Sequence, residues 1–283
     1  MRRYAEPIRL AVGIAIAAWV GAAYPVVAQE DGVRLASHRA IYDLKLADSR
    51  GRRSLSSVQG RIVYDFAGTH CEGYTLQFRQ VTELDNGEGK VVVSDLRSTT
   101  WEEGDGKGYR FNFQNYLSEK LVDSVDGRAE RKSDAIAIKL AKPGDKQFSL
   151  DTVTVFPTEH IRRIVVAARE GKTFLEVPLY DGSESGEKLY STLTIIGQVI
   201  PPDQRKPDDA AAGQAALEGL KRWPVTISYF DRSKQGGEQM PVYSIKFELY
   251  ENGLSRALIL DYGDFSISGT MSTLEMRDTK PCQ

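Results

Sequence analysis

The sequence predicts an all-β fold with a few helices. Beyond residue 38, apolar residues alternate with polar residues over most of the chain, which is the period expected of strands with one apolar face. Glycine, asparagine, aspartate and proline residues separate these runs at short intervals, as in chains of antiparallel strands. Counting the segments with this alternation gives roughly 12 to 15 strand-like runs, and the chain has no internal repeat.

Strand-like runs follow one another through the first half of the chain. Turn signals at 85–87, 103–106 and 126–127 contain Asn-Gly or Asp-Gly pairs, which are typical of tight hairpins. Strands joined by such turns pair in antiparallel fashion. The expected strands cover residues 38–46, 61–66, 74–81, 91–101, 109–116, 120–125 and 135–140.

One helix interrupts this pattern between residues 156 and 171. Its apolar positions share one face, and charged side chains occupy the rest of the surface. We expect Pro157 or Thr158 to begin the helix and Gly171 to end it. The apolar face should pack against the inner or rim face of a curled sheet, through the residues Ile161, Ile164, Val165 and Ala168.

The remaining strands lie in the C-terminal half. We expect them at residues 174–180, 188–200, 225–230, 242–250 and 265–271, with a weaker helix at 208–220. In the last strand the apolar positions change from odd to even numbers after Met271, because the next ones are Leu274 and Met276. An extra residue near 272–273 would explain the change, and such a bulge bends a sheet at a closing edge.

The N-terminus has the composition of a secretory signal peptide. Arg2 and Arg3 precede an apolar run, and the small residue Ala28 ends a plausible cleavage site. A membrane helix is the alternative, but glycine and Pro25 interrupt the run, and no later apolar run is long enough to span a membrane. We therefore expect a signal peptide at 1–28 and one domain at 29–283 that does not span a membrane.

Charge and cysteine content restrict the partners and the compartment. The net charge of −2 gives no indication of nucleic-acid binding. Two cysteines in an exported protein usually pair in an oxidising compartment, although two separate buried thiols remain the alternative. A bridge between Cys71 and Cys282 would hold the last strand beside one of the first, so the sheet would be curled.

The sequence contains no motif that indicates catalysis, a metal or a cofactor. His38, His70 and His160 lack the spacing of a metal site. We interpret His160 as a histidine at the edge of the helix and His70 as a turn residue. The segment 182–186 resembles a nucleophile elbow, but Glu184 occupies the position of the nucleophile. We therefore expect a protein that is not an enzyme and has no cofactor.

Large aromatic residues on the strands are the candidates for a cavity wall. Trp101, Phe111 and Phe113 fit an ordinary core, but a closed sheet of more than about ten strands is too wide for its own side chains to fill. A helix, a ligand or water must then occupy the centre. Phe111 and Phe113 share one face of their strand, and the sequence leaves open which face points inward.

Several segments together resemble the EipB family of periplasmic proteins from alphaproteobacteria. They are Gly60-Arg-Ile-Val-Tyr-Asp-Phe66, which leads to Cys71-Glu-Gly-Tyr74, and the ending Leu274-Glu-Met-Arg-Asp-Thr-Lys-Pro-Cys282. The resemblance implies a monomer whose spiral-like, incompletely closed antiparallel β barrel has about 14 strands, with helices at or in its cavity. It also implies a disulfide between the two cysteines and a shape similar to periplasmic lipoprotein carriers.

The expected role is support of cell envelope integrity under stress from the periplasm. The expected partner is an apolar ligand, namely a lipid, a lipoprotein or a hydrophobic peptide, with other periplasmic envelope proteins as further partners. A hydrolase acting on envelope polymers is one alternative. An outer-membrane β barrel is another, although the chain ends without an aromatic residue and has a helix in mid-sequence.

Overall fold

The computed structural model describes residues 32–50, 55–89, 91–204, 208–233, 240–279 and Cys282. The predicted signal peptide at 1–28 lies outside the described residues. Among the residues described there are fourteen strands in one sheet, one α-helix and one 3-10 turn. The all-β fold class is therefore confirmed.

The strands are long in the first half of the chain and shorter in the second. The first eight are β1 (His38–Ser49), β2 (Ser57–Thr69), β3 (Gly73–Asp85), β4 (Val91–Glu102), β5 (Gly108–Leu117), β6 (Lys120–Arg131), β7 (Ile136–Lys142) and β8 (Lys146–Leu150). The helix α1 (Pro157–Arg169) follows. The second half contains β9 (Phe174–Leu179), β10 (Tyr190–Ile196), the 3-10 turn η1 (Ala215–Leu217), β11 (Arg222–Asp231), β12 (Tyr243–Tyr250), β13 (Ser255–Asp261) and β14 (Phe265–Met276).

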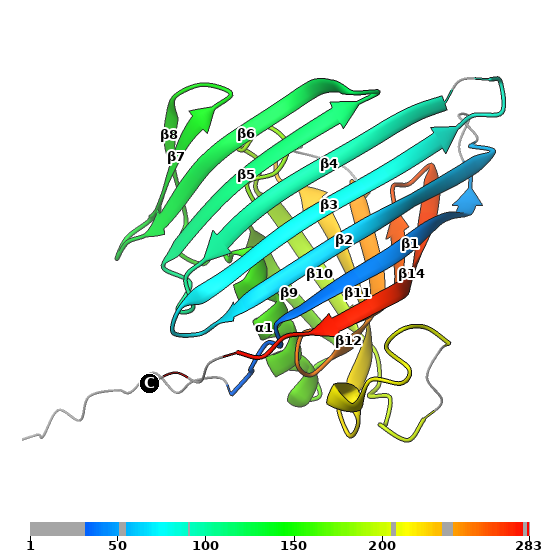
Figure 1. Ribbon diagram of the computed structural model, residues 1–283. Coiled ribbons are helices and arrows are strands. Elements are labelled where there is room, and N and C mark those ends of the chain that lie inside the picture. Colours follow the sequence, from blue (N-terminus) through cyan, green and yellow to red (C-terminus); the bar gives the residue numbers. More distant parts are fainter. Residues whose placement is uncertain are drawn as a thin grey trace, which may run out of the picture. The chain divides into compact units, whose positions relative to one another are not determined.

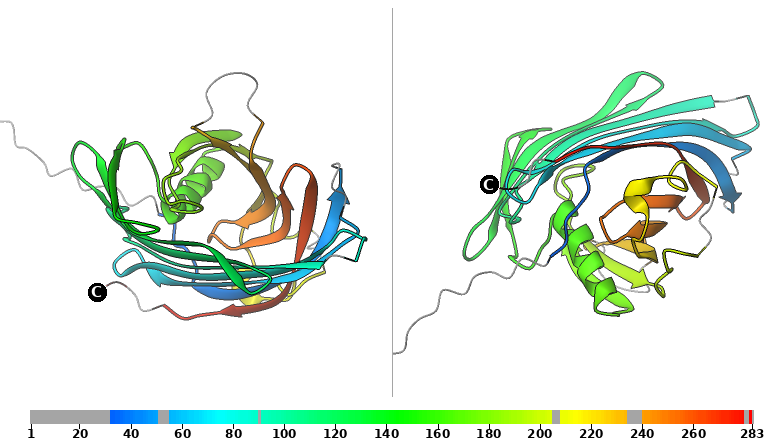
Figure 2. Two further views of the ribbon diagram at one scale, coloured as in Figure 1. Left: turned by 90° about the horizontal axis from the view of Figure 1, so that it is seen from above. Right: turned by 60° about the horizontal axis from the view of Figure 1, so that its bottom comes forward.

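The sheet is a meander whose two chain ends meet. Each strand from β1 to β8 pairs with the next, each strand from β9 to β14 does the same, and β1 pairs with β14. All of these pairs are antiparallel. The consecutive strands β8 and β9 are the two edges, and α1 lies between them in the sequence. The sheet is therefore curled but not closed, with β1 to β6 in front of α1 and β9 to β12 (Figures 1 and 2).

The helix begins and ends where the sequence predicts. Pro157 takes the first helical position, where its missing N–H costs nothing. The buried carboxylate of Glu102, at the end of β4, accepts hydrogen bonds from the N–H groups of Thr158 and Glu159, both at 2.7 Å. Gly171 has φ +73°, the left-handed conformation that commonly follows a helix. A residue distant in sequence thus caps the helix.

The predicted bulge in the last strand is confirmed. Ile41 pairs with Thr273 and Tyr42 pairs with Met271, which leaves Ser272 as the extra residue. The inward positions change parity at this point, and Met271 and Leu274 are both buried. The sheet can therefore bend at the β1–β14 junction while both residues remain in the core.

The predicted hairpin turn at 126–127 is wrong. Asp126 and Gly127 lie inside β6 and pair with Asn112 and Phe111 of β5. A Cβ on Gly127 would approach the Phe111 ring to 2.5 Å, so this glycine makes room for an aromatic side chain. The turn between β5 and β6 is instead Ser118-Glu119, with φ values of 46° and 69°.

The predicted helix at 208–220 is also wrong, since it forms only the turn η1. The Asp209 carboxylate accepts a hydrogen bond from the N–H of Ala211 at 2.9 Å, and such local bonds favour turns over helices. The same carboxylate forms a buried ion pair with Arg256 of β13, with the closest N–O distance at 2.6 Å. Tertiary pairing thus replaces the helix.

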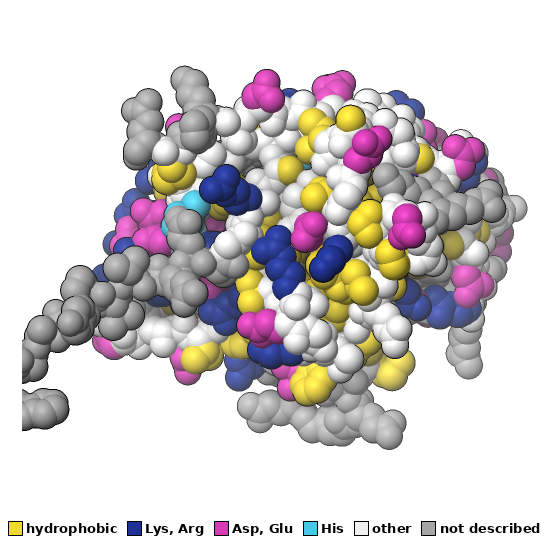
Figure 3. Space-filling model, turned by 90° about the horizontal axis from the view of Figure 1, so that it is seen from below, with side chains coloured by type: hydrophobic (Ala, Val, Ile, Leu, Met, Phe, Trp, Pro, Cys, Tyr) yellow, Lys and Arg dark blue, Asp and Glu magenta, His cyan; other side chains and the backbone are white. Residues whose placement is uncertain are grey.

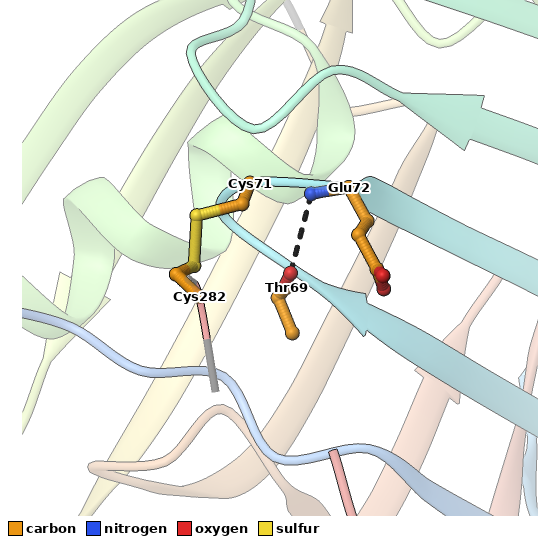
Figure 4. Close-up of a disulfide and its surroundings, with 4 residues drawn as sticks. All are labelled: Thr69, Cys71, Glu72 and Cys282. Atoms are coloured by element: carbon orange, nitrogen blue, oxygen red, sulfur yellow. Dashed lines mark hydrogen bonds between the residues drawn. A yellow bond between two sulfur atoms is a disulfide. The ribbon is translucent and has the colours of Figure 1, made fainter. Parts of the chain in front are cut away.

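The disulfide between Cys71 and Cys282 is present, with a Cα–Cα distance of 5.9 Å (Figure 4). Cys71 lies in the turn between β2 and β3, where the N–H of Glu72 donates a hydrogen bond to Thr69 Oγ1 at 3.2 Å. Cys282 follows β14, so the bond ties the end of the chain to an early hairpin. The two described cysteines are therefore not free thiols.

Candidate functional site

The curled sheet encloses two adjoining hollows of about 230 Å³ and about 210 Å³. Their walls come from β1 to β3 on one side and from β11 to β13 on the other, with α1 at one end. Both hollows are lined by His38, Tyr64, Ile161, Ile227, Tyr229 and Gly253. These shared residues make the two hollows one site, which we call the central cavity.

Stacked rings form one wall of the central cavity. The rings of His38 and Tyr64 lie 5.5 Å apart, those of Tyr64 and Phe66 lie 6.3 Å apart, and those of Phe66 and Tyr74 lie 5.4 Å apart. These residues sit at inward positions of β1, β2 and β3, because strand alternation places every second side chain inside. This wall is therefore largely aromatic.

A second series of rings runs across the opposite wall. The ring of Tyr229 lies 5.9 Å from that of Tyr190 and 5.6 Å from that of Tyr243, and Tyr243 is 5.1 Å from Tyr262. Tyr229 and Tyr243 also alternate with the aliphatic residues Ile227 and Ile245 on the same walls. The aromatic surface thus continues from β10 to the turn after β13.

Three phenol groups give this apolar cavity a polar component. No described residue forms a hydrogen bond with the hydroxyl of Tyr64, Tyr229 or Tyr243, whereas Tyr42 donates to the carbonyl of Ser255 at 2.7 Å. Burial raises the pKa of Tyr64 to about 12, so its phenol stays protonated at neutral pH. The cavity can therefore offer hydrogen-bond donors to a polar group on an otherwise apolar molecule.

The helix α1 is fixed inside the sheet by a buried histidine. His160 is 2% exposed, and its Nε2 lies 3.4 Å from the hydroxyls of Thr192 and Thr194 on β10. Burial lowers the pKa of His160 to about 4, and Arg163 adds to the shift, so the ring is neutral. The interpretation of His160 as an edge histidine is wrong, because its ring is buried against β10. Sequence patterns did not show that this strand lies beside the helix.

The helical candidates have different roles. Ile161 lines the central cavity, whereas Ile164, Val165 and Ala168 are buried in the main core cluster with Ile196, Ile227 and other residues. The apolar face of the helix therefore packs inside the sheet, as expected. Only one of its four residues reaches the cavity.

The strand candidates are placed apart from the central cavity. Phe111 and Phe113 face inward together, but Phe111 is 3% exposed and is enclosed by Tyr109, Phe156 and Tyr180. Trp101 was expected on the cavity wall, and this is wrong. Its neighbours Thr100 and Glu102 take the inward positions of β4, so Trp101 lies on the outer face.

A second part of the interior is filled by the chain itself. The loop between β9 and β10 enters it with Tyr180, whose hydroxyl donates to the carbonyl of Gly186 at 2.6 Å. Gly182 lies so close to Phe111 that a Cβ would approach the ring to 2.5 Å. These residues form a compact cluster with the inward side chains of β5 to β8, which we call the filled half.

The cavity tyrosines were missed by sequence reasoning, although a signal was present. Tyr229 and Tyr243 have the same parity as Ile227 and Ile245, so the alternation already assigned each tyrosine to the apolar face of its strand. The sequence did not show that β11 and β12 are neighbours in which Tyr229 lies directly opposite Tyr243. Pairing register supplied that information.

Histidine, cysteine and carboxylate side chains of the described residues form no group of three or more suited to a metal ion. No helix in the described part of the chain is long and apolar enough to cross a membrane.

On the face seen from below, hydrophobic side chains lie between lysine, arginine and carboxylate groups (Figure 3).

The fold and site define a class of protein, namely an unclosed antiparallel sheet that is curled around an apolar cavity, with a disulfide that ties the segment after the last strand to an early hairpin. A model of the EipB-like family matches residues 29–278. The chain therefore belongs to the EipB-like family.

A curated protein and a solved structure, both from Brucella abortus, are similar to this chain over nearly their whole length. The cell envelope integrity protein EipB is 38% identical over 277 residues, which cover 98% of this chain and 96% of that protein. A crystal structure of a beta-barrel-like protein with a domain of unknown function superposes with a TM-score of 0.79 at 36% identity. The alignment covers 87% of this chain and all of the other.

Proposed function

We propose that this protein supports cell envelope integrity from the periplasm by holding an apolar ligand in the central cavity, without chemical change to that ligand. Family membership and a relative named for cell envelope integrity support the envelope role. The disulfide between Cys71 and Cys282 fits an oxidising compartment such as the periplasm.

The central cavity is the observation that carries the ligand proposal. Its two hollows of about 230 Å³ and 210 Å³ adjoin, and ligand pockets generally measure about 300–1,000 Å³. Aliphatic and aromatic side chains form most of the walls, as in sites for lipid chains or hydrophobic peptides. The free phenols of Tyr64, Tyr229 and Tyr243 favour a ligand that carries a carbonyl or hydroxyl group next to its apolar part.

A role without catalysis fits the polar groups of the cavity. Ser255 is the serine of the cavity lining, and no described histidine or carboxylate forms a hydrogen bond with its hydroxyl. The Nδ1 atom of His38 is engaged by the carbonyl of Ala36 at 2.7 Å. Nothing in the described lining thus resembles an activated nucleophile, and the hydrolase alternative has no specific observation in its favour.

The test begins with native mass spectrometry of protein purified from its own periplasm, where we expect a retained lipid, lipoprotein fragment or peptide. Delipidated protein should then bind a fluorescent fatty acid saturably. Ile161→Trp should weaken this binding at least tenfold, because the larger ring occupies the cavity. Ile195→Trp is the matched control, since Ile195 is 49% exposed and faces away from the interior.

Two outcomes would overturn the proposal. One is protein that is empty when taken from the periplasm and binds neither fatty-acyl nor apolar peptide probes. The other is equal binding by the wild type and by an Ile161→Trp variant that melts at the same temperature as the wild type. Conversion of a bound acyl ester to a free acid would favour the hydrolase alternative instead.

A further inference from the structure

The outer face of the sheet carries a groove that the cavity proposal does not involve. The groove has a volume of about 850 Å³ and runs across β3 to β8. Its floor includes one row of residues that are directly opposite each other in neighbouring strands. In strand order this row is Thr75, Trp101, Arg110, Arg128, Lys139 and Gln147.

Three consecutive members of the row carry the same charge. Arg110 is opposite Arg128, and Arg128 is opposite Lys139. Side chains in such pairs have Cβ atoms about 5 Å apart, and like charges in this position destabilise a sheet. The Arg110 guanidinium lies over the Trp101 ring at 5.3 Å, and all three cationic side chains are exposed.

No described carboxylate forms an ion pair with these three cations. Asp126 and Asp145 also line the groove, and Asp126 keeps its charge because its hydrogen-bond donor at 2.9 Å is the neutral amide of Asn112. A fourth cation, Lys146, is 2.6 Å from Glu187 and is therefore already neutralised. The three cations Arg110, Arg128 and Lys139 thus outnumber the two carboxylates of the lining, which leaves a small excess of positive charge.

A second pair of opposite arginines on the same face shows how the fold otherwise handles this repulsion. Arg79 and Arg97 face each other on β3 and β4, and both bind the carboxylate of Asp95, at 2.9 Å and 2.6 Å. These hydrogen bonds lower the pKa of Asp95 to about 2. In the groove, Asp126 lies two residues before Arg128, as Asp95 lies before Arg97, but no described ion pair joins it to Arg110 or Arg128. A bound anion is therefore a fitting counterpart of these cations.

The lining indicates the kind of anion. The strands β3 to β7 are paired on both sides, so a peptide could add a strand only at the edge strand β8 and not along the row of cations. Hydroxyl and amide groups of Thr75, Thr99, Asn112 and Gln147 surround the cations, and they suit a ligand rich in hydroxyl groups better than an apolar membrane. The three cations span two strand spacings, roughly 10 Å, so repeated anionic groups fit better than one small ion.

We propose that this groove binds an acidic saccharide chain, whose carboxylate or phosphate groups pair with Arg110, Arg128 and Lys139. Guanidinium groups recognise both anions through paired hydrogen bonds. The groove lies on the face opposite the central cavity, so the proposal does not depend on the cavity ligand. A protein of this kind would hold an apolar molecule inside and a charged glycan outside.

The test uses the full mature protein and a hexamer of galacturonic acid, with binding measured by isothermal titration calorimetry. The double variant Arg110→Gln/Arg128→Gln should bind the hexamer at least tenfold more weakly than the wild type. The matched control Arg79→Gln/Arg97→Gln removes the same charge from the same face and should change binding less than twofold. Circular dichroism melting checks that each variant is folded, and Lys139→Gln provides an independent single change.

Three results would overturn the proposal. The first is no binding of the hexamer by the wild type, and the second is an equal loss in both double variants, which would indicate only general charge attraction. The third is a response to inorganic phosphate or to phosphatidylglycerol vesicles that depends on Arg110 and Arg128 while the hexamer does not bind. That result would assign the row to a small anion or a lipid surface instead.

Discussion

The filled half and the central cavity are built from the same alternating strands, yet one is solid and the other hollow. In the filled half, Phe156 and Tyr180 belong to connecting segments that are not strands, and their side chains pack against Tyr109 and Phe111. Around the cavity, rings such as Tyr64 and Tyr229 stack along their own walls and do not cross the gap. The interior of a curled sheet is thus solid where side chains of connecting segments pack inside it, and hollow where they do not.

The difference extends to how each region is held together. The filled half is stabilised by side chains that interlock, and Gly127 and Gly182 give the ring of Phe111 its space. The region of the central cavity also contains two links between segments distant in sequence, namely the disulfide and the buried ion pair of Asp209 with Arg256. We therefore expect the two regions to respond differently to the same kind of mutation.

The largest effect should come from removing the disulfide that ties the segment after β14 to the turn between β2 and β3. Cys71→Ser should destabilise the protein by up to roughly 5 kcal/mol, because the bond closes a loop of 211 residues in the unfolded chain. The double variant with Cys282→Ser should be no less stable than either single variant, since each removes the same bond. Denaturant unfolding measures this, and two free thiols in protein from the periplasm would contradict it.

A charge at the helix that supports the cavity should have the next largest effect. Ile164 is fully buried in the main core cluster, so Ile164→Asp should cost roughly 3–5 kcal/mol, as for an uncompensated buried charge. The exposed Ile195→Asp is the control and should change the melting temperature little. Similar melting of the two variants would show that the helix is not anchored inside the sheet.

Acid should weaken the contact between the helix and β10. The pKa of His160 is lowered from 6.5 to about 4 by burial, so below pH 6.5 the unfolded chain binds a proton more readily than the folded protein. Stability from this residue is complete above pH 6.5 and falls by roughly 3 kcal/mol as the pH drops to about 4. The melting temperature should therefore fall more between pH 7 and pH 4 for the wild type than for His160→Leu. An equal fall in both proteins would contradict the assignment.

The smallest effect compares added volume in the two regions directly. Gly127→Ala should cost about 1–3 kcal/mol, because its Cβ would meet the rings and methyl groups of Phe111 and Leu140 in the filled half. Ile245→Phe adds more volume at the cavity wall and should cost less than about 1 kcal/mol, since space is present there. An equal loss in chemical denaturation would indicate that the cavity is as tightly packed as the filled half.

The sequence by itself predicted the strands, the helix at α1, the bulge near Ser272 and the pairing of the two cysteines. These features depend on local spacing, such as the period of two in strands and the turn residues between them. The resemblance to the EipB family added the unclosed sheet, which periodicity alone did not indicate. Alternation also placed Phe111 and Phe113 on one face of β5 without showing which face points inward.

Only the tertiary structure decided what each face meets. Trp101 lies outside because strand register gives the inward positions of β4 to Thr100 and Glu102. Asp126 and Gly127 stay in β6 because Phe111 needs the space, although an Asp-Gly pair favours a turn. The segment 208–220 does not form the predicted helix, because the Asp209 carboxylate pairs with Arg256, which is distant in sequence. Hollow and filled regions differ for the same reason, since contacts between distant segments outweigh local preferences of a fraction of a kcal/mol per residue.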